Sequence, residues 1–400
     1  ANLFSYCGAE VEREYLINDG GNQVTILGQS VLASVGLIED SDDYYHGEYI
    51  KSWAKANKKT IETEKDNPKK LGQLFAEEIL EKEIKPAVKL MKINFDHWFS
   101  EKLLIEKGEV NKAIADFKNR KLTYQKDGAL WFKTTEFGDD KDRVLVKEDH
   151  ETTYFANDSA YHWDKFAKRK YDLVINFWGA DHHGYVNRML AAVAAMGFEG
   201  QLKIIIMQLV RLIKDGKEVR MSKRLGTYIT MEELIELIGG DKSEATDVAR
   251  FFFLSRDFST HMDFDLDLAK ERSEKNPVYY VKYAHARTCS LQRKADDLKL
   301  PAANVELIKE KEELDLIKEL AEFPTLIEEI VSSQYYPVHQ LIFYAQSLSA
   351  KFHYFYDQCQ IIDPKDLQKT ALRLEIVRAT QIVLKNLMVD LIGIKAPERM

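Results

Sequence analysis

Apolar runs and helix-like segments alternate between residues 152 and 210, and this alternation constrains the fold more than any other feature. The apolar runs, each short enough for one strand, are Thr152–Phe155, Leu173–Trp178 and Ile204–Val210. Between them lie a helix candidate at Ser159–Arg169, with Asp158 at its N-cap position, and an apolar-faced helix candidate that stops at Gly197. Strand–helix repeats of this length favour right-handed crossovers, so the sequence predicts a parallel sheet in an α/β fold.

Polar residues follow two of the strand candidates, at the edge where open α/β sheets bind their ligands. Asn18–Gln23 follows a strand candidate at Val11–Ile17, and Gly179–Gly184 follows the candidate at Leu173–Trp178. The alternative for either segment is a plain turn between a strand and a helix.

The segment Gly179–Gly184 has three interpretations. A metal site would use Asp181, His182 and His183, with His162 as a further ligand. Adjacent side chains on an extended segment point to opposite faces, and the sequence has no His-x-x-x-His pair, so we expect no metal site. The second interpretation is a small-molecule pocket, with one histidine directed inward and the other capping the next helix. The third is a purely structural pair of histidines.

A basic loop follows the last of these strand candidates. Between residues 203 and 226, seven Lys and Arg residues oppose two acids, in a chain of formal net charge −8. The loop is bounded by Gly216 and Gly226 and contains Ser222, and this combination of mobility, positive charge and a hydroxyl suits polyphosphate binding. The alternative is a solvated surface loop. A helix that opens with a capping box, Thr230 with Glu233, is expected after it.

Composition limits the class of protein. Four hundred residues predict roughly two to four domains, and the contents of 45% hydrophobic and 30% charged residues are typical of a globular chain. No apolar run approaches the roughly 20 residues of a membrane span, and the N-terminus lacks the pattern of an export signal. Cys7, Cys289 and Cys359 are far apart, which favours reduced thiols. We therefore expect a cytoplasmic protein without membrane contact.

Residues 37–147 are polar and mixed in charge, and we expect them to form an insertion outside the central sheet. The insertion is predicted to contain a helix at Leu71–Ile84 and a hairpin turn at Asp127-Gly128. Its strand candidates are Ile93–Trp98, Gly128–Thr134 and Arg143–Lys147. The acidic run at 137–143 lacks the spacing of a calcium-binding loop and is expected to be a solvated turn.

From about residue 270 onward the sequence predicts continuous helix, beginning at Pro277. Between residues 270 and 299, eight Lys and Arg residues oppose four acids, and tyrosines are interleaved with them. Unpaired RNA bases stack on aromatic rings while phosphates meet basic side chains, so this composition favours RNA binding. The alternative is an ordinary helix with Tyr279 and Tyr283 on its buried face.

Several segments, taken together and in this order, resemble the arginyl-tRNA synthetases of the bacterial type, a class I aminoacyl-tRNA synthetase family. Arg220–Arg224 is similar to the Lys-Met-Ser-Lys-Ser signature of class I, with arginine at its first and last positions. Thr153–His162 resembles the arginine-pocket signature of the family. The other matching segments are Phe137–Leu145, Trp178–Val186 and Ala396–Met400. The resemblance covers essentially the whole chain.

The resemblance implies an α/β fold with a partial class I Rossmann-like parallel sheet and an insertion, followed by an all-α helical-bundle anticodon-binding domain. The first part of the catalytic domain would occupy residues 1–36 and the insertion residues 37–147. The second half of the catalytic domain would occupy residues 148–269, with the signature loop at 220–224, and the anticodon-binding domain residues 270–400.

The resemblance also implies roles for individual residues. Tyr154, Asp158 and His182 would meet arginine, and His182 stands where some relatives have glutamine. An aspartate suits a guanidinium because it accepts a planar pair of hydrogen bonds. Lys223 and Arg220 would be catalytic, with Lys223 stabilising the pentavalent phosphate during adenylate formation. The remaining implied contacts are Met221, Ser222, Gly179 and Asp181, together with Lys223, for ATP, and Tyr283, Arg287 and Met400 for tRNA.

The implied function is arginine–tRNA ligation, in which ATP activates L-arginine and the amino acid is transferred to tRNA-Arg. ATP would be a substrate used with Mg²⁺, and no tightly bound cofactor is expected. In this family activation generally requires bound tRNA, and we expect the protein to be a monomer.

One departure from the family pattern changes this expectation. Class I synthetases have a His-x-Gly-His sequence early in the nucleotide-binding fold, and this tetrapeptide is absent from the chain, which begins at Ala1 within a helix-like segment. The sequence therefore predicts a C-terminal fragment of the enzyme that is inactive alone. The alternatives are a non-catalytic RNA-binding module and a metal-dependent hydrolase built on Asp181, His182 and His183.

Overall fold

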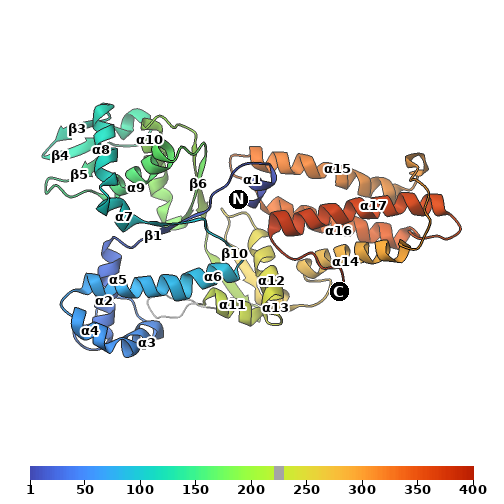
Figure 1. Ribbon diagram of the computed structural model, residues 1–400, viewed down its shortest axis with the longest axis horizontal. Helices are drawn as coiled ribbons and strands as arrows, with labels where there is room; N and C mark the ends of the chain where they lie inside the picture. Colours follow the sequence, from blue (N-terminus) through green and yellow to red (C-terminus); the bar gives the residue numbers. More distant parts are fainter. Residues whose placement is uncertain (220–228) are drawn as a thin grey trace.

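The computed structural model describes residues 1–219 and 229–400. Figure 1 shows two lobes on one side, which a central region joins to an elongated helical bundle. Arg220, Met221, Ser222 and Lys223, which the sequence assigns to the signature loop, lie outside the described residues. None of the helices within the described ranges is long and apolar enough to cross a membrane.

Parallel strand pairs form the centre of the α/β part. They are β1 (Glu14–Ile17) with β2 (His97–Ser100), β6 (Val174–Gly179) with β7 (Leu202–Met207), and β8 (Val210–Lys214) with β10 (Met262–Asp265). The short strand β9 (Lys217–Glu218) pairs with β8 in the antiparallel direction. The parallel pairing confirms the prediction of an α/β fold, because it requires crossover connections rather than hairpins.

The helix α9 (Tyr154–Trp163) begins earlier than the sequence predicts. Its N-cap is Thr153, whose hydroxyl accepts a hydrogen bond from the backbone N–H of Ala156 at 3.2 Å. The predicted strand Thr152–Phe155 is therefore wrong, and Thr152 forms only an isolated bridge with Val146. The threonine cap ends the extended segment because it satisfies a backbone N–H that a strand would have to pair elsewhere.

Asp158 lies inside α9, so its predicted place as the N-cap of a helix at Ser159–Arg169 is wrong. The helix continues without a break into the wider π-helical turn η3 (Asp164–Lys168). After β6 follow the 3₁₀ turn η4 (Ala180–Tyr185) and the helix α10 (Val186–Ala195). The chain turns at Gly197, with φ of 91°, and this confirms the predicted end of the helix.

The upper lobe in Figure 1 is a small antiparallel sheet packed against helices. Its strands are β3 (Thr123–Lys126), β4 (Ala129–Phe132) and β5 (Arg143–Val146). Asp127 and Gly128 join β3 to β4 with φ of 51° and 73°, which confirms the predicted hairpin turn. Its other elements are α7 (Glu101–Glu106), α8 (Glu109–Asn119) and the 3₁₀ turn η2 (Thr134–Phe137).

One hydrophobic core joins this sheet to α9, α10 and the strands β6 and β7. Phe117 of α8 stacks on Phe132 of β4 with ring centroids 4.8 Å apart, and Phe155 and Met189 bury against the same cluster. In addition, β2 belongs to the segment 37–147 but pairs with β1, although the strand candidate Ile93–Trp98 was expected to lie outside the central sheet. The domain boundaries at residues 36 and 147 stay predictions.

The lower lobe consists of helices that pack around a second core. They are α2 (Asn22–Ser34), α3 (Glu48–Ala56), α4 (Lys58–Glu64) and α5 (Pro68–Ile79). The π turn η1 (Leu80–Ile84) and α6 (Lys85–Leu90) continue from α5 to the central region, where Leu90 packs against a different core. The backbones of α2 and α5 touch: a Cβ added to Gly28 would lie 1.8 Å from the carbonyl oxygen of Pro68, and one on Gly72 equally close to that of Val24. Only glycine therefore fits at both crossing points.

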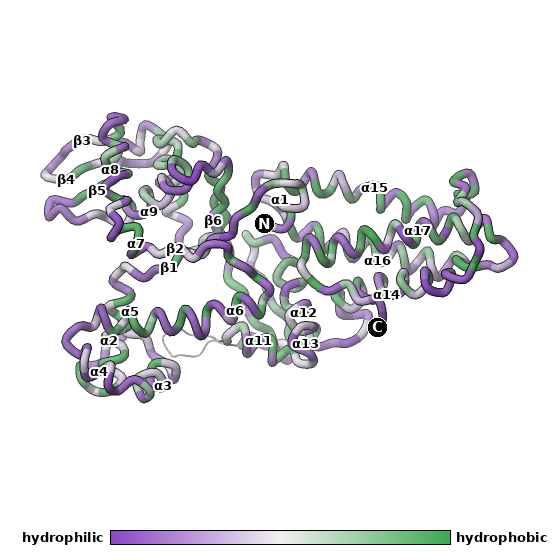
Figure 2. The backbone as a smooth tube through the Cα atoms, in the orientation of Figure 1, coloured by the Kyte–Doolittle hydropathy of each residue, from purple (hydrophilic) through white to green (hydrophobic). Residues whose placement is uncertain are grey.

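The third core fills the central region and the helical bundle. Its helices are α1 (Asn2–Tyr6), α11 (Met231–Ile238), α12 (Lys242–Leu254), α13 (Leu266–Lys270), α14 (Pro277–Ala295), α15 (Lys311–Ser332), α16 (His339–Gln358), α17 (Leu367–Lys385) and η6 (Asn386–Ile392). The short 3₁₀ turn η5 (Val305–Leu307) lies outside this core, between α14 and α15. In Figure 2 the bundle helices carry hydrophobic and hydrophilic residues in alternation, as expected for helices with one buried face. The all-α C-terminal part is thus as predicted, including the helix start at Pro277.

Candidate active site

The carboxyl ends of β1 and β2 are tied together by Asp19. Its carboxylate accepts one hydrogen bond from the hydroxyl of Ser100 at 2.5 Å and another from the backbone N–H of Lys102 at 2.9 Å. Ser100 also caps α7 by accepting a hydrogen bond from the N–H of Leu103. These contacts position the polar loop after β1, where the sequence predicts a ligand site, beside the N-terminus of α7.

Tyr154 stands at the start of α9 and exposes 65% of its surface. A Cβ placed on Gly21, in the loop after β1, would lie 3.8 Å from the Tyr154 hydroxyl. The tyrosine therefore faces the strand-end loop across the candidate site. Its exposure excludes a role as an aromatic residue of the hydrophobic core.

Asp158 lies one helical turn after Tyr154, and its side chain is largely enclosed. The pKa of its carboxyl group is raised to about 6, chiefly by burial and in part by the nearby acid Glu101, while Tyr185, His182 and Lys165 oppose the rise. A carboxylate in such surroundings gains strongly from a cationic partner, because the partner replaces the hydration that burial removes.

Tyr185 faces this carboxyl group from the end of η4. Burial and the Asp158 carboxylate both raise the pKa of its phenol. Its hydroxyl oxygen is buried close to the Asp158 carboxylate, within reach of a hydrogen bond to that group. The guanidinium of Arg188 lies over the ring at 4.7 Å and holds it in place. A hydroxyl that donates to Asp158 keeps the lone pairs of its oxygen, so it can still accept a hydrogen bond from a polar ligand group.

The residues of η4 differ in part from their expected arrangement. Asp181, His182 and His183 lie on a 3₁₀ turn rather than on an extended segment, and all three are exposed. His182 is 3.7 Å from Asp181 and 6.0 Å from the ring of Trp178. The cap position of α10 is Tyr185, which makes no side-chain cap, so the predicted capping histidine is wrong.

Gly179 ends β6 beside these residues. A Cβ at this position would come within 2.7 Å of a carboxylate oxygen of Asp181, so a side chain here would displace the aspartate. The further ligand named for the metal-site alternative, His162, is buried and uses both ring nitrogens in hydrogen bonds. No group of three or more potential metal ligands occurs in residues 1–219 and 229–400.

The elements before and after the signature loop are each held by side-chain contacts. Before it, Arg211 on β8 pairs with Asp263 on β10 at 2.7 Å. After it, α11 opens with the predicted capping box: Thr230 accepts from the N–H of Glu233 at 3.1 Å, and the glutamate accepts from the N–H of Thr230 at 2.7 Å.

A second candidate site lies on the bundle, where α14 and α16 expose aromatic side chains around Arg287. The guanidinium of Arg287 donates to the Tyr283 hydroxyl at 2.7 Å and covers the rings of Tyr283 and Tyr356 at 4.8 and 4.0 Å. His353 stacks on Tyr283 with ring centroids 5.6 Å apart. Tyr283 exposes 43% of its surface, so the alternative that placed it on the buried face of the helix is wrong. Met400, also predicted to contact tRNA, is exposed at the chain end.

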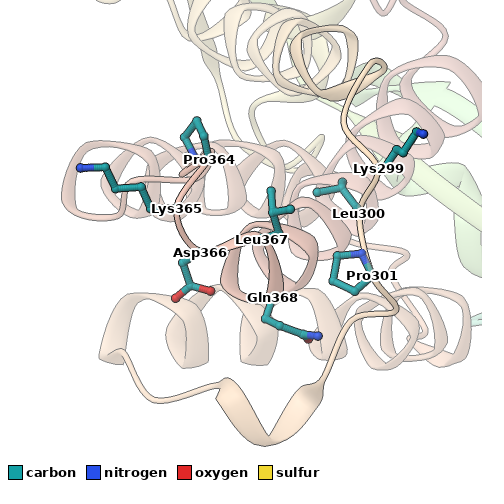
Figure 3. A pocket seen from close by; sticks show the side chains of 8 residues that line it. All are labelled: Lys299, Leu300, Pro301, Pro364, Lys365, Asp366, Leu367 and Gln368. Carbon is teal, nitrogen blue, oxygen red and sulfur yellow. The ribbon is translucent and has the colours of Figure 1, made fainter.

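The bundle also contains a separate hollow of about 610 Å³. Figure 3 shows the side chains that line it. Its walls come from the segment around Pro301 and from the start of α17, with Asp366 and Gln368 among the lining residues. None of its lining residues belongs to either candidate site.

The comparisons with known proteins agree with this arrangement. Residues 32–248 match the family described as tRNA synthetases class I (R), catalytic domain, and residues 281–400 match the DALR anticodon binding domain. The chain belongs to the class I arginyl-tRNA synthetases. The second match also confirms that the C-terminal helices form the anticodon-binding part of an arginyl-tRNA synthetase.

Individual relatives support the same family. The chain is 41% identical to "Arginine--tRNA ligase 1" of Halalkalibacterium halodurans and 41% identical to "Arginine--tRNA ligase" of Bacillus subtilis. In both comparisons the match covers 100% of this chain and 72% of the relative. A crystal structure from Campylobacter jejuni, designated an arginyl tRNA synthetase, is 30% identical with a TM-score of 0.82, covering 100% of this chain and 87% of that one. The Thermus thermophilus arginyl-tRNA synthetase, at 20% identity, shares the fold with a TM-score of 0.78, covering 100% of this chain and 78% of that one.

Sequence reasoning about this arginyl-tRNA synthetase missed several residues of the two sites. Tyr185 received no role, although it lies within the quoted signature Trp178–Val186. Tyr356 and His353 also received none, because their link to Tyr283 depends on the packing of α16 against α14. The signal in the sequence was that His353 and Tyr356 are three residues apart, so that on a helix they lie on the same face.

Proposed function

We infer that this arginyl-tRNA synthetase binds the guanidinium of L-arginine at Asp158, between Tyr154 and Tyr185. The observation that carries the proposal is the enclosed Asp158 carboxyl group, which lies beside the buried hydroxyl of Tyr185. A guanidinium has five donors in a planar fork, so it can pair with the carboxylate and still donate to a neighbouring hydroxyl oxygen. A lysine ammonium cannot form the same planar pair, which gives a physical basis for selecting arginine.

The proposal places ATP next to this pocket. Lys223 and Arg220 carry the positive charge that the developing charge on the phosphate requires, and Met221 and Ser222 belong to the same signature loop. Gly179 offers a backbone that a ligand can approach closely, and Asp181 offers an exposed carboxylate. Mg²⁺ bound chiefly by phosphate oxygens needs one or two protein carboxylates, which fits Asp181. The ion would neutralise phosphate charge during attack by the arginine carboxylate.

The tRNA is proposed to meet the second site through Tyr283, Arg287 and Met400. The exposed part of the Tyr283 side chain suits contact with an unpaired base, and Arg287 supplies charge for a neighbouring phosphate. The protein is proposed to act as a monomer in the cytoplasm.

The test compares Asp158→Asn with Asp172→Asn, an exposed aspartate at the other end of β6. Isothermal titration with L-arginine should show a loss of roughly 2–5 kcal/mol in binding free energy for Asp158→Asn, by analogy with buried charge pairs. Asp172→Asn should bind like the unchanged protein. Arginine affinity of Asp158→Asn within twofold of the unchanged protein would remove Asp158 from the pocket.

The thermal midpoint separates a binding defect from misfolding. The folded-state pKa of Asp158 lies above its ordinary value, so ionisation costs stability as pH rises through about 6. Asparagine carries no charge and avoids this cost. At pH 7.5 the Asp158→Asn variant should therefore melt at the same temperature or higher, although it loses arginine affinity.

A further inference from the structure

His162 lies directly beneath Asp158 in the interior of the protein, with only 2% of its surface exposed. Its Nδ1 atom is 2.7 Å from the backbone carbonyl oxygen of Asp158, and its Nε2 atom is 2.8 Å from the side-chain nitrogen of Asn176 on β6. A carbonyl oxygen only accepts hydrogen bonds, so Nδ1 carries the proton and Nε2 accepts from the amide. Both ring nitrogens are therefore used, in one defined tautomer.

The orientation of Asn176 is fixed by a neighbour on its other side. Its amide oxygen is 3.5 Å from the ammonium of Lys165, a group that only donates hydrogen bonds. The amide nitrogen of Asn176 therefore points toward His162. Lys165 is itself held in place, 3.6 Å from the carboxylate of Glu14 on β1 and 3.9 Å above the ring of Tyr161.

Glu14 fixes the same helix from a different strand. It bonds Tyr161, Lys165 and Arg169, which follow one another at intervals of four residues along α9 and the π turn η3. These contacts hold the helix against β1. The bonds from the Asp158 carbonyl through His162 to Asn176 hold the turn that carries the Asp158 side chain against β6.

We propose that His162 and Asn176 form a positioning pair that fixes the Asp158 turn of α9, so that the carboxylate meets the arginine guanidinium with both oxygens. The proposal rests on the arginine-binding role given to Asp158 above. A carboxylate that binds a guanidinium through both oxygens must be oriented to within about 10–20°. A carboxylate on a helix that can shift against its sheet does not meet this limit. The pair acts through Asp158 and does not touch the substrate.

The chemistry of His162 suits this role. Burial lowers the pKa of the imidazole to about 3, and the charge of Lys165 acts in the same direction, so the ring stays neutral at physiological pH. A neutral ring does not compete with the substrate for the negative charge of Asp158. The pair therefore orients the carboxylate without neutralising it.

The test uses Asn176→Leu, which keeps the approximate shape and removes the hydrogen bond, His162→Phe, which removes both bonds, and His162→Gln, which retains an amide. The matched control is Trp163→Phe on the same helix, which removes a bond of 3.2 Å to Asp116 on another face. Arginine affinity is measured by isothermal titration and thermal midpoints by calorimetry, for each variant. Nitrogen-15 NMR of the unchanged protein reports the tautomer of His162.

Asn176→Leu and His162→Phe should each weaken arginine binding tenfold or more, and His162→Gln should recover part of the loss. Trp163→Phe should keep the affinity within twofold, even if its midpoint falls. The NMR spectrum should show a neutral ring protonated on Nδ1.

Three results would overturn the proposal. They are unchanged affinity in folded Asn176→Leu and His162→Phe, an equal affinity loss in Trp163→Phe, and a ring protonated on Nε2. The NMR result stands even if a variant does not fold. Normal binding by Asp158→Asn, or no arginine binding by the unchanged chain, would instead overturn the arginine site itself and this inference with it.

Discussion

The ammonium group of Lys282 on α14 lies 2.6 Å from the carboxylate of Asp247 on α12, and both side chains are buried. The same carboxylate pairs with Lys92, after α6, and accepts a hydrogen bond from the backbone N–H of Lys395 at 3.1 Å. One buried acid thus joins the first bundle helix, the central region and the C-terminal tail. The neighbour of Lys282, Tyr283, points outward into the proposed tRNA site.

Replacement of Asp247 should destabilise this junction strongly. Asp247→Asn leaves the Lys282 ammonium buried without a countercharge, and breaking such a pair costs about 3–5 kcal/mol. Urea denaturation measures the change in the free energy of unfolding. Asp315→Asn, which breaks an exposed pair with Lys311, serves as the control and should cost less than about 1 kcal/mol. Equal effects in the two variants would show that burial at Asp247 has no energetic importance.

Arginine affinity should depend on pH through Asp158. Binding requires the ionised carboxylate, and the free protein protonates it as pH falls below about 6. Affinity should therefore be constant above pH 7 and fall about tenfold per pH unit below 6, with proton release on binding. Titration calorimetry in two buffers of different ionisation enthalpy measures both effects. A profile for Asp158→Asn as steep as that of the unchanged protein would assign the dependence to another group.

Gly28→Ala should disrupt the lower lobe. The added methyl group would overlap the carbonyl oxygen of Pro68, so α2 and α5 would have to separate along their whole contact. Forcing extra volume into packed elements costs about 1–3 kcal/mol, and here the obstacle is backbone that cannot rotate away. Gly184→Ala is the control, because nothing lies within 4 Å of its added Cβ. Thermal midpoints of the two variants should differ by several degrees, and equal midpoints would contradict the close helix contact.

Tyr283→Ala should weaken tRNA binding by about 1–3 kcal/mol, the usual value of one base stacked on an aromatic ring. Arg287→Lys should have a smaller effect, since it keeps the charge but loses the planar contact with Tyr283 and Tyr356. Filter binding at a fixed salt concentration measures both. Tyr335→Ala removes another exposed tyrosine and should leave the affinity unchanged. An equal loss in Tyr335→Ala would show that the effect is not specific to the α14–α16 site.

The sequence by itself determined the features that depend on neighbouring residues. The capping box of Thr230 with Glu233, the hairpin turn at Asp127-Gly128 and the helix end at Gly197 all appear as predicted. Each is decided within a few residues, by a side-chain cap or by a backbone angle that few residue types adopt. The family signatures are also local strings, and they were sufficient to predict an arginyl-tRNA synthetase with an α/β part and an all-α part.

Only the tertiary structure decided how these local pieces meet. It paired β2 with β1 across about eighty residues of sequence and joined His162 to Asn176 on β6. It also exposed Tyr283 and brought Gly28 against Pro68. Such contacts join residues that are distant in the chain, and their free energy depends on burial and on the exact distance between two elements. Neither quantity can be read from a local pattern of residues, because the same string is compatible with several ways of packing.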